Sequence, residues 1–385
     1  MENSGNRPGQ LSYFSSEQQR LRMAVREVIK KEVLPHIERW EEAGGFPREK
    51  YDLFGDLGFL GVGFPEDVGG SGGDIFDLIT VSEEMMRSGS GGFAASIGSL
   101  NIALPPIVRH GTPEQIERFV RPVLHGKRIA ALGITEPGGG SDVANIQTTA
   151  VRDGKSYRVN GSKTFITSGA RADQLTCAVR TGEAGAHGIS FLVIEKQTPG
   201  YTVGNVLKKM GWWASDTAEI FFDDCLVPVG NLIGKENEGF YTIMENFQAE
   251  RLQLSVMANM TSQMALEETL AYTKERKAFG RPLKGFQVVR HKLVEMSTLV
   301  EISREFTYRV ASKINAGIDQ VKEISMAKNF ACSVSDRVTH EAVQLFGGYG
   351  YMRGYLVERL YRDNRILSIG GGTTEIMKEI ISKLI

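Results

Sequence analysis

The stretch from Thr148 to Thr167 reads T-T-A-V-R-D-G-K-S-Y-R-V-N-G-S-K-T-F-I-T. Apolar and polar residues alternate along much of it, which is typical of strands. Asp153-Gly154 and Asn160-Gly161 suit tight hairpin turns. The pattern predicts three short strands, at Thr148 to Arg152, Ser156 to Val159 and Ser162 to Thr167. Long helical patterns lie on both sides, so this stretch decides the fold class.

The β pattern continues toward the C-terminus. Segments rich in β-branched and aromatic residues follow at Ile189 to Ile194, Tyr201 to Val206 and Ala218 to Phe222. We expect residues 126–235 to form a small antiparallel β-domain, closed as a barrel so that no strand edge stays bare.

The chain before this β-domain has a helical period. Residues 1–125 are expected to form an all-helical domain. Ser16 is a candidate cap for the first helix, with Gln19 reaching back to complete a capping box. Further helices are expected at Asp77 to Ser88 and Phe93 to Val108.

The helical period returns after the β-domain and persists to the end. Short Gly/Pro breaks separate the segments, which favours an antiparallel four-helix bundle over residues 236–385. The helices are expected at Phe240 to Glu275, Phe286 to Ala316, Asp319 to Phe346 and Glu375 to Leu384. The fold class is therefore α+β, with an N-terminal helical domain, a middle β-barrel and a C-terminal bundle.

Composition excludes several kinds of partner. The 385 residues carry a net charge of −1, which leaves no basic field for nucleic acid or an anionic membrane. Cys177, Cys225 and Cys332 lie far apart without ligand spacing, so no metal site is expected. No apolar run approaches the roughly 20 residues that span a bilayer. The first fourteen residues lack a targeting signal, so we expect a soluble cytoplasmic protein.

Two segments are candidates for chemistry on the residues alone. Gly133 to Asp142 places the hydroxyls of Thr135 and Ser141 around a glycine-rich turn, which suits close approach of an extended ligand. A plain strand-to-loop connection explains the same residues equally well. Glu250 and Arg251 stand together near the start of a long helix, either as a solvated face or as a catalytic base with a cationic neighbour.

Motifs spread over the chain, from about residue 15 to the end, resemble the acyl-CoA dehydrogenase family and occur in that family's order. They are T-E-P-G-G-G-S-D at Thr135 to Asp142, N-G-S-K-T-F-I-T-S-G at Asn160 to Gly169, Ser215-Asp216-Thr217, E-R-K-A-F-G at Glu275 to Gly280 with Gln287, Q-L-F-G-G-Y-G at Gln344 to Gly350, and Tyr361-Arg362-Asp363 followed by G-G-G-T-T-E-I.

The resemblance implies an FAD site between the β-domain and the bundle. It places Ile134, Thr135, Phe165 and Thr167 against the flavin ring, and Thr373 and Glu375 against the pyrophosphate, with Ser141 in both the cofactor and the substrate set. It brings Arg276, Phe279, Gln287, Gln344, Gly347 and Gly348 to the adenosine half of a neighbouring subunit's cofactor. It also implies a homotetramer, built as a dimer of dimers, and an electron-transfer flavoprotein as partner.

The resemblance also bears on the base. Many family members carry it as Glu in an E-G-T motif, where this chain has Gly371-Gly372-Thr373. The isovaleryl-CoA and long-chain branches carry it instead at the position of Glu250. We therefore expect Glu250 to be the base, Gly371 to leave room for its carboxylate and for the substrate, and Arg251 to contact the acyl-CoA. Glu375 and Glu245 are weaker alternatives, because Glu375 matches a phosphate-facing position and Glu245 lies more than a helical turn away.

The leading hypothesis is oxidation of a long-chain or branched acyl-CoA to the trans-2-enoyl-CoA. Two alternatives stay open at this point. A flavin oxidase or monooxygenase on the same scaffold would consume oxygen with acyl-CoA alone. A catalytically inactive acyl-CoA-binding relative would show no flavin bleaching on mixing with acyl-CoA.

Overall fold

The computed structural model describes residues 13–385, so residues 1–12, on which most of the targeting interpretation rests, lie outside the described residues. The described chain before residue 130 is helical, as predicted. Its α-helices are α1 (Ser16–Glu32), α2 (Ile37–Ala43), α3 (Glu49–Asp56), α4 (Ile75–Met86), α5 (Gly91–Ile97), α6 (Leu100–Ala103), α7 (Pro105–His110), α8 (Pro113–Gln115) and α9 (Arg121–Leu124).

Two local predictions in this region are wrong. Ser15, not Ser16, caps α1, and Gln18 completes the capping box. The single helix expected at Phe93 to Val108 is three short helices, because Gly98 ends α5 and Pro105 begins α7. Proline has no N–H for a helical hydrogen bond, so it is tolerated at the first position of a helix and interrupts a helix elsewhere.

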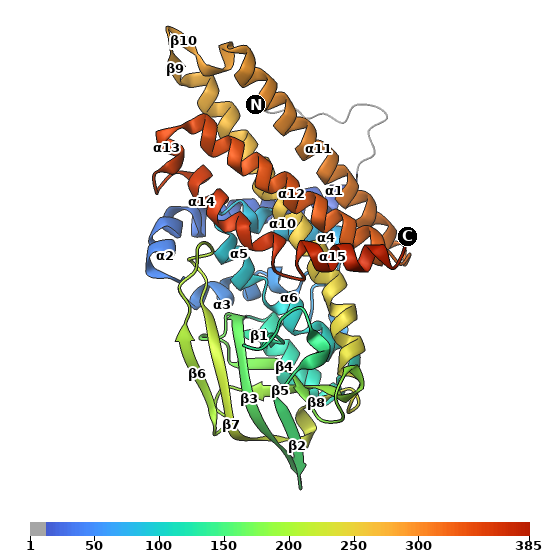
Figure 1. Cartoon of the computed structure of the whole chain (residues 1–385). Coiled ribbons are helices and arrows are strands. Elements are labelled where there is room, and N and C mark those ends of the chain that lie inside the picture. The colour runs from blue at the N-terminus through green and yellow to red at the C-terminus, as the bar shows by residue number, and fades with distance from the viewer. Residues whose placement is uncertain (1–12) are drawn as a thin grey trace.

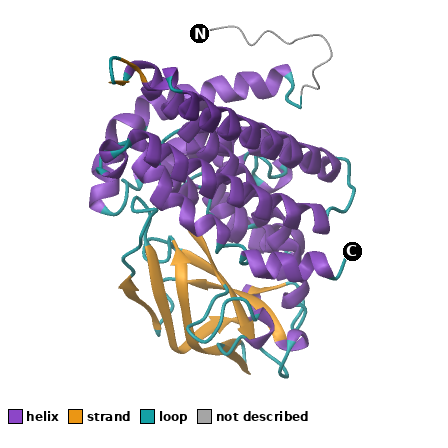
Figure 2. Ribbon diagram, turned by 45° about the horizontal axis from the view of Figure 1, so that its top comes forward, coloured by secondary structure: helices purple, strands orange, loops and turns teal. Residues whose placement is uncertain are grey.

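One sheet dominates the middle of the chain (Figures 1 and 2). Its strands are β1 (Ala130–Gly133), β2 (Thr149–Asp153), β3 (Ser156–Thr167), β4 (Gln174–Arg180), β5 (Ile189–Glu195), β6 (Tyr201–Val206), β7 (Thr217–Pro228) and β8 (Leu232–Ile233). They pair in the order β6-β7-β3-β2-β4-β5-β8, and β1 pairs with β4.

The sheet is neither purely antiparallel nor shown to close. β1 runs parallel to β4, with β2 and β3 between them in the chain. A parallel pair needs such a long connection, which the local strand pattern does not reveal. The path ends at β6 and β8, which do not pair with each other, so the expected closed barrel is not confirmed.

Asn160-Gly161 is not the turn that the sequence predicts. β3 runs straight through it and pairs with both β2 and β7, while the β3–β7 register shifts between Val159 and Gly161. Gly161 has φ +144°, and a Cβ there would lie 2.7 Å from Thr148 Cα. The dipeptide is therefore a bulge, and the glycine leaves room for the backbone at Thr148. The turn at Gly154, between β2 and β3, agrees with the prediction.

The C-terminal helices follow the predicted segments closely. They are α10 (Gly239–Glu275), α11 (Gln287–Asn315), α12 (Val321–Phe346), α13 (Gly348–Tyr351), α14 (Leu356–Asn364) and α15 (Thr374–Ser382), with a small hairpin of β9 (Lys277–Ala278) and β10 (Arg281–Pro282) after α10. The helix α10 runs from the sheet to the far end of the bundle, where this hairpin lies (Figure 1). It is therefore the element that connects the two parts.

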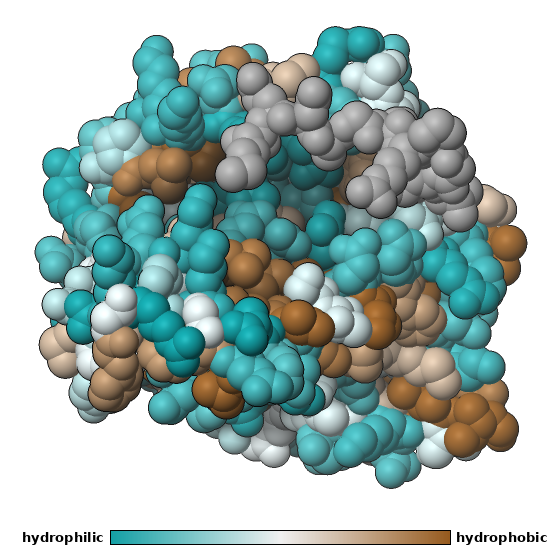
Figure 3. Space-filling model, turned by 90° about the horizontal axis from the view of Figure 1, so that it is seen from above, coloured by the Kyte–Doolittle hydropathy of each residue, from teal (hydrophilic) through white to brown (hydrophobic). Residues whose placement is uncertain are grey.

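The domain division 1–125, 126–235 and 236–385 stays a prediction. One core cluster combines the N-terminal helices with the sheet, and a second lies inside the helical bundle. Seen from above, hydrophobic side chains form separate patches among hydrophilic ones (Figure 3).

Within residues 13–385 no single helix is long and apolar enough to cross a membrane, although the bent pair Gly91–Ile97 and Leu100–His110 passes that test together.

Candidate active site

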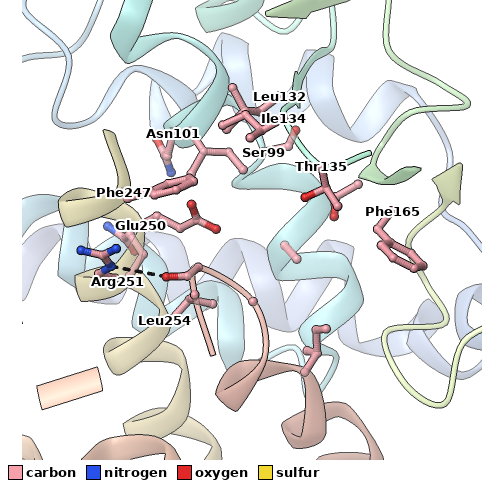
Figure 4. A pocket seen from close by; sticks show the side chains of 18 of the residues that line it. Ser99, Asn101, Leu132, Ile134, Thr135, Phe165, Phe247, Glu250, Arg251 and Leu254 are labelled. Carbon is pink, nitrogen blue, oxygen red and sulfur yellow. Dashed lines mark hydrogen bonds between the residues drawn. The ribbon is translucent and has the colours of Figure 1, made fainter. Parts of the chain in front are cut away.

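A cavity of about 860 Å³ lies where the N-terminal helices, the sheet and the bundle meet. One face of the first half of α10 lines this cavity, with side chains three or four residues apart. These are Phe240, Met244, Phe247, Glu250, Leu254 and Met257. At 1.5 Å per residue they extend along roughly 25 Å of helix. The cavity is therefore long, and Glu250 lies in its middle part (Figure 4).

The Glu250 carboxylate is the acidic group placed for chemistry here. Its surroundings are apolar, and burial raises its pKa to about 7, against the opposing effects of the Arg251 and Lys328 charges. No hydrogen bond to this carboxylate is formed within residues 13–385. A carboxylate with a raised pKa and no partner is suited to take a proton from a ligand near neutral pH.

Gly371 lies directly opposite Glu250. A Cβ built on Gly371 would stand 3.5 Å from both Cδ and Oε1 of Glu250. The same atom would stand 2.6 Å from Leu254 Cδ1, and Gly371 has φ +62°, where side chains are disfavoured. The two residues that the sequence analysis paired therefore meet in one place, and the missing side chain leaves the space between them open.

The loop that carries Gly371 also offers hydrogen-bond donors. Arg251 is buried, and its Nε donates to the Gly371 carbonyl over 3.4 Å (Figure 4). The backbone N–H groups of Gly371 and Gly372 find no acceptor within the described residues. They border the cavity and can donate to a bound oxygen. Sequence reasoning missed these donors, although the run Gly370-Gly371-Gly372 signals backbone exposed to a ligand.

The sheet side of the cavity suits a planar, polar cofactor. Thr135 and Thr167 line it, and their hydroxyls have no hydrogen-bond partner within residues 13–385. Phe165 also lines it, is 67% exposed and has φ +59°. An aromatic residue in this conformation is uncommon and is often found at functional sites. With Ile134 beside them, these residues fit the ring of a flavin, as the resemblance implies.

The remaining residues of the predicted cofactor and substrate sets fall into two places. Ser141 and Thr373 line the same cavity, and Thr373 also caps α15 by accepting from Ile376 N–H. Glu375 lies in the first turn of α15, exposed and outside the cavity lining. Glu245 is likewise outside it and lies 3.5 Å from Arg109. Neither carboxylate competes with Glu250 by position.

The residues expected at the adenosine half do not reach this cavity. They are exposed and lie at the other end of the bundle, around the β9–β10 hairpin and α13 (Figure 1): Arg276, Phe279, Gln287, Gln344, Gly347 and Gly348. Between residues 250 and 276 the helix α10 spans about 39 Å. One chain therefore cannot bring both groups to one dinucleotide.

Sequence reasoning also missed Trp212. It lines the cavity with φ +56°, and its backbone N–H donates to Oδ1 of Asp363 over 2.6 Å. Its indole lies against Gly91, where a Cβ would be 2.3 Å from Trp212 Nε1. No local motif distinguishes this tryptophan from a core residue, and only its backbone conformation marks it.

Comparisons with known proteins agree with this architecture. Residues 15–127, 131–225 and 237–385 match the N-terminal, middle and C-terminal domains of acyl-CoA dehydrogenase. The chain is 40% identical over 380 residues to the mouse mitochondrial long-chain specific acyl-CoA dehydrogenase, covering 97% of this chain and 87% of that protein. It is 36% identical to subunit CarC of the caffeyl-CoA reductase–Etf complex of Acetobacterium woodii, covering 97% and 99%. A probable acyl-CoA dehydrogenase structure from Mycobacterium abscessus shares 50% identity and a TM-score of 0.96, covering 97% and 100%.

Proposed function

Because the chain belongs to the acyl-CoA dehydrogenase family, we propose that it oxidises a long-chain or branched acyl-CoA with Glu250 as the base. The chain is an FAD-dependent oxidoreductase, and acyl-CoA dehydrogenation is its general reaction. The observation that carries the finer proposal is the position of the half-buried Glu250 carboxylate opposite a residue without a side chain, Gly371.

Glu250 would remove the α-proton of the thioester. This proton is weakly acidic, so the base must be ionised, held close and shielded from water. The raised pKa of Glu250, about 7, leaves a useful ionised fraction at neutral pH and still makes the carboxylate a good proton acceptor. Arg251, which holds the Gly371 carbonyl, would fix the loop against the substrate.

The thioester oxygen would be met by the backbone N–H groups of Gly371 and Gly372. Negative charge grows on this oxygen as the α-proton leaves, and preorganised donors stabilise such charge. FAD, when bound, supplies the acceptor for the hydride from Cβ. Ile134, Thr135, Phe165 and Thr167 would hold its ring, with Ser141 and Thr373 near its polar part and the CoA thioester. Glu375, which lies outside the cavity lining in the first turn of α15, would contact the pyrophosphate from there.

The shape of the cavity favours a long or branched acyl group. Beyond Glu250 it continues along Leu254 and Met257. Helix α5 and the residue after it contribute Ala94, Ala95, Ile97 and Gly98 to the lining, and all of these except Ile97 are small. The absent side chain at Gly371 widens the cavity at the reacting carbons, where a branch would lie.

A screen of acyl-CoA substrates tests this proposal. Mixing the enzyme anaerobically with saturated acyl-CoAs of increasing length and with branched ones is expected to bleach the flavin fastest for long or branched chains. The rate of bleaching, measured by absorbance in a stopped-flow instrument, ranks the substrates. A preference for short straight chains would contradict the proposed substrate class. Oxygen uptake with acyl-CoA alone would favour an oxidase, and no bleaching with any substrate would favour an inactive relative.

We also propose a homotetramer, built as a dimer of dimers. The two groups of predicted FAD residues lie too far apart to serve one cofactor in one chain, so a neighbouring subunit would complete each site. Light scattering is expected to give a mass four times the 42.4 kDa of one chain. A stable monomer that keeps its FAD would contradict this assembly.

The proposed electron acceptor is an electron-transfer flavoprotein, which fits the Etf complex named for the Acetobacterium relative. A cytoplasmic location also stays a proposal, which cell fractionation tests.

A further inference from the structure

Lys328 is a buried cation without a carboxylate partner. It lies on α12 with no exposed surface, and no carboxylate comes within 4.0 Å of its ammonium group in the described chain. Lys163, the other lysine among the largest fully buried side chains, pairs with Glu136 over 2.7 Å. Buried lysines are rare unless paired, because desolvating a charge is costly. The unpaired charge of Lys328 therefore calls for a reason.

The hydrogen bond of Lys328 leads to the active-site loop. Its Nζ donates to the carbonyl of Gly372, and the side chain of the next residue, Asn329, donates to the Thr374 carbonyl over 3.1 Å. From α10, Arg251 holds the Gly371 carbonyl. Two helices thus fix the successive carbonyls of the loop.

The conformation of the loop makes these anchors necessary. Gly371 and Gly372 have φ +62° and +96°, which most residues avoid and which leave no side chain to hold the loop in place. Within residues 13–385, the hydrogen bonds that reach Gly371 and Gly372 are those to their carbonyl groups. A shift of the loop would move the Gly371 N–H relative to the carboxylate.

The charge of Lys328 also acts on the base. The charged groups that act on Glu250 are Arg251 and Lys328, and both lower its pKa. In turn, burial lowers the pKa of Lys328, while Cys332, Glu250 and Glu375 raise it and Arg251 lowers it. Lys328 is therefore the cation that reaches Glu250 from the α12 side, across the loop.

We propose that Lys328 is a positioning residue for the dehydrogenation. It holds the Gly371–Gly372 loop against Glu250, and its charge increases the ionised fraction of the Glu250 carboxylate at neutral pH. This inference rests on the proposed role of Glu250 as the base.

The test separates the charge from the hydrogen bond. Lys328→Gln keeps a donor for the Gly372 carbonyl and removes the charge, whereas Lys328→Arg keeps both. In Lys328→Gln the midpoint of the pH profile of anaerobic flavin reduction is expected to rise by about one unit above that of the wild type, with recovery of the rate at alkaline pH. In Lys328→Arg the midpoint is expected to stay at the wild-type value. Lys322→Gln, which removes a partly exposed charge on the same helix, is the control and should leave the midpoint unchanged.

A second measurement does not depend on turnover. Infrared difference spectra can follow protonation of the Glu250 carboxyl, identified as the band absent from Glu250→Gln, and this band should titrate at higher pH in Lys328→Gln. An unchanged midpoint and an unchanged band in Lys328→Gln would overturn the inference. That outcome leaves the proposed function intact, which fails only if Glu250→Gln reduces flavin normally.

Discussion

Replacing Glu250 by glutamine is expected to slow anaerobic flavin reduction by acyl-CoA by about a hundredfold or more. The amide is nearly the same size as the carboxylate but cannot accept the α-proton. FAD content and acyl-CoA affinity should stay close to wild type, because the residues expected to hold both ligands are unchanged. Stopped-flow absorbance gives the rate of reduction, and the spectral shift on adding an unreactive acyl-CoA analogue gives the affinity.

Two control variants sharpen this test. Glu245→Gln removes a carboxylate from the same helix that faces Arg109 and does not line the cavity, so its reduction rate should be that of the wild type. Glu375→Gln examines the other carboxylate near the loop and should reduce flavin far better than Glu250→Gln. Near-normal flavin reduction by Glu250→Gln, or an equally large loss of the reduction rate in Glu375→Gln, would contradict the assignment of Glu250 as the base.

The long helices could be predicted because their information is local. The expected bounds of α10, α11 and α12 differ from the observed ones by two residues at most, since apolar periodicity and Gly/Pro breaks mark both ends. The sheet depends on distant partners. The pairing of β1 with β4 and the bulge at Gly161 arise from contacts across the sheet. The local sequence Asn160-Gly161 is typical of a turn, but the strand continues through it.

In the active site, too, some residues could be predicted from the sequence and others depend on distant contacts. Cavity-lining positions such as Thr135 and Phe165 could be predicted because whole motifs resemble those of one family. The local sequence around Glu250 does not distinguish a base from a solvated helix residue. The decisive contact joins segments about 120 residues apart, where Arg251 and Glu250 meet Gly371. The loop donors and Trp212 escaped prediction because their roles depend on backbone conformation and burial.

Replacing Gly371 by alanine is expected to slow flavin reduction by roughly ten- to a hundredfold. The added methyl group would stand 3.5 Å from the Glu250 carboxylate, in the space proposed for the reacting carbons. It would also stand 2.6 Å from Leu254 Cδ1, so that side chain must rotate along the cavity wall. The positive φ at this position should lower the free energy of unfolding by about 1–2 kcal/mol. Stopped-flow reduction and urea unfolding measure the two effects.

Gly370→Ala is the matched control for this loop. A Cβ at Gly370 meets only Ile366 O at 3.5 Å, and the residue does not have a positive φ. Alanine there should fit without strain and leave the protein at least as stable as the wild type. In Gly371→Ala, the rate of flavin reduction should fall more with branched substrates than with straight ones, because a branch needs the space that the methyl group takes. Equal losses in the two variants, or full activity of Gly371→Ala on branched substrates, would show that the open space at Gly371 has no part in receiving the substrate.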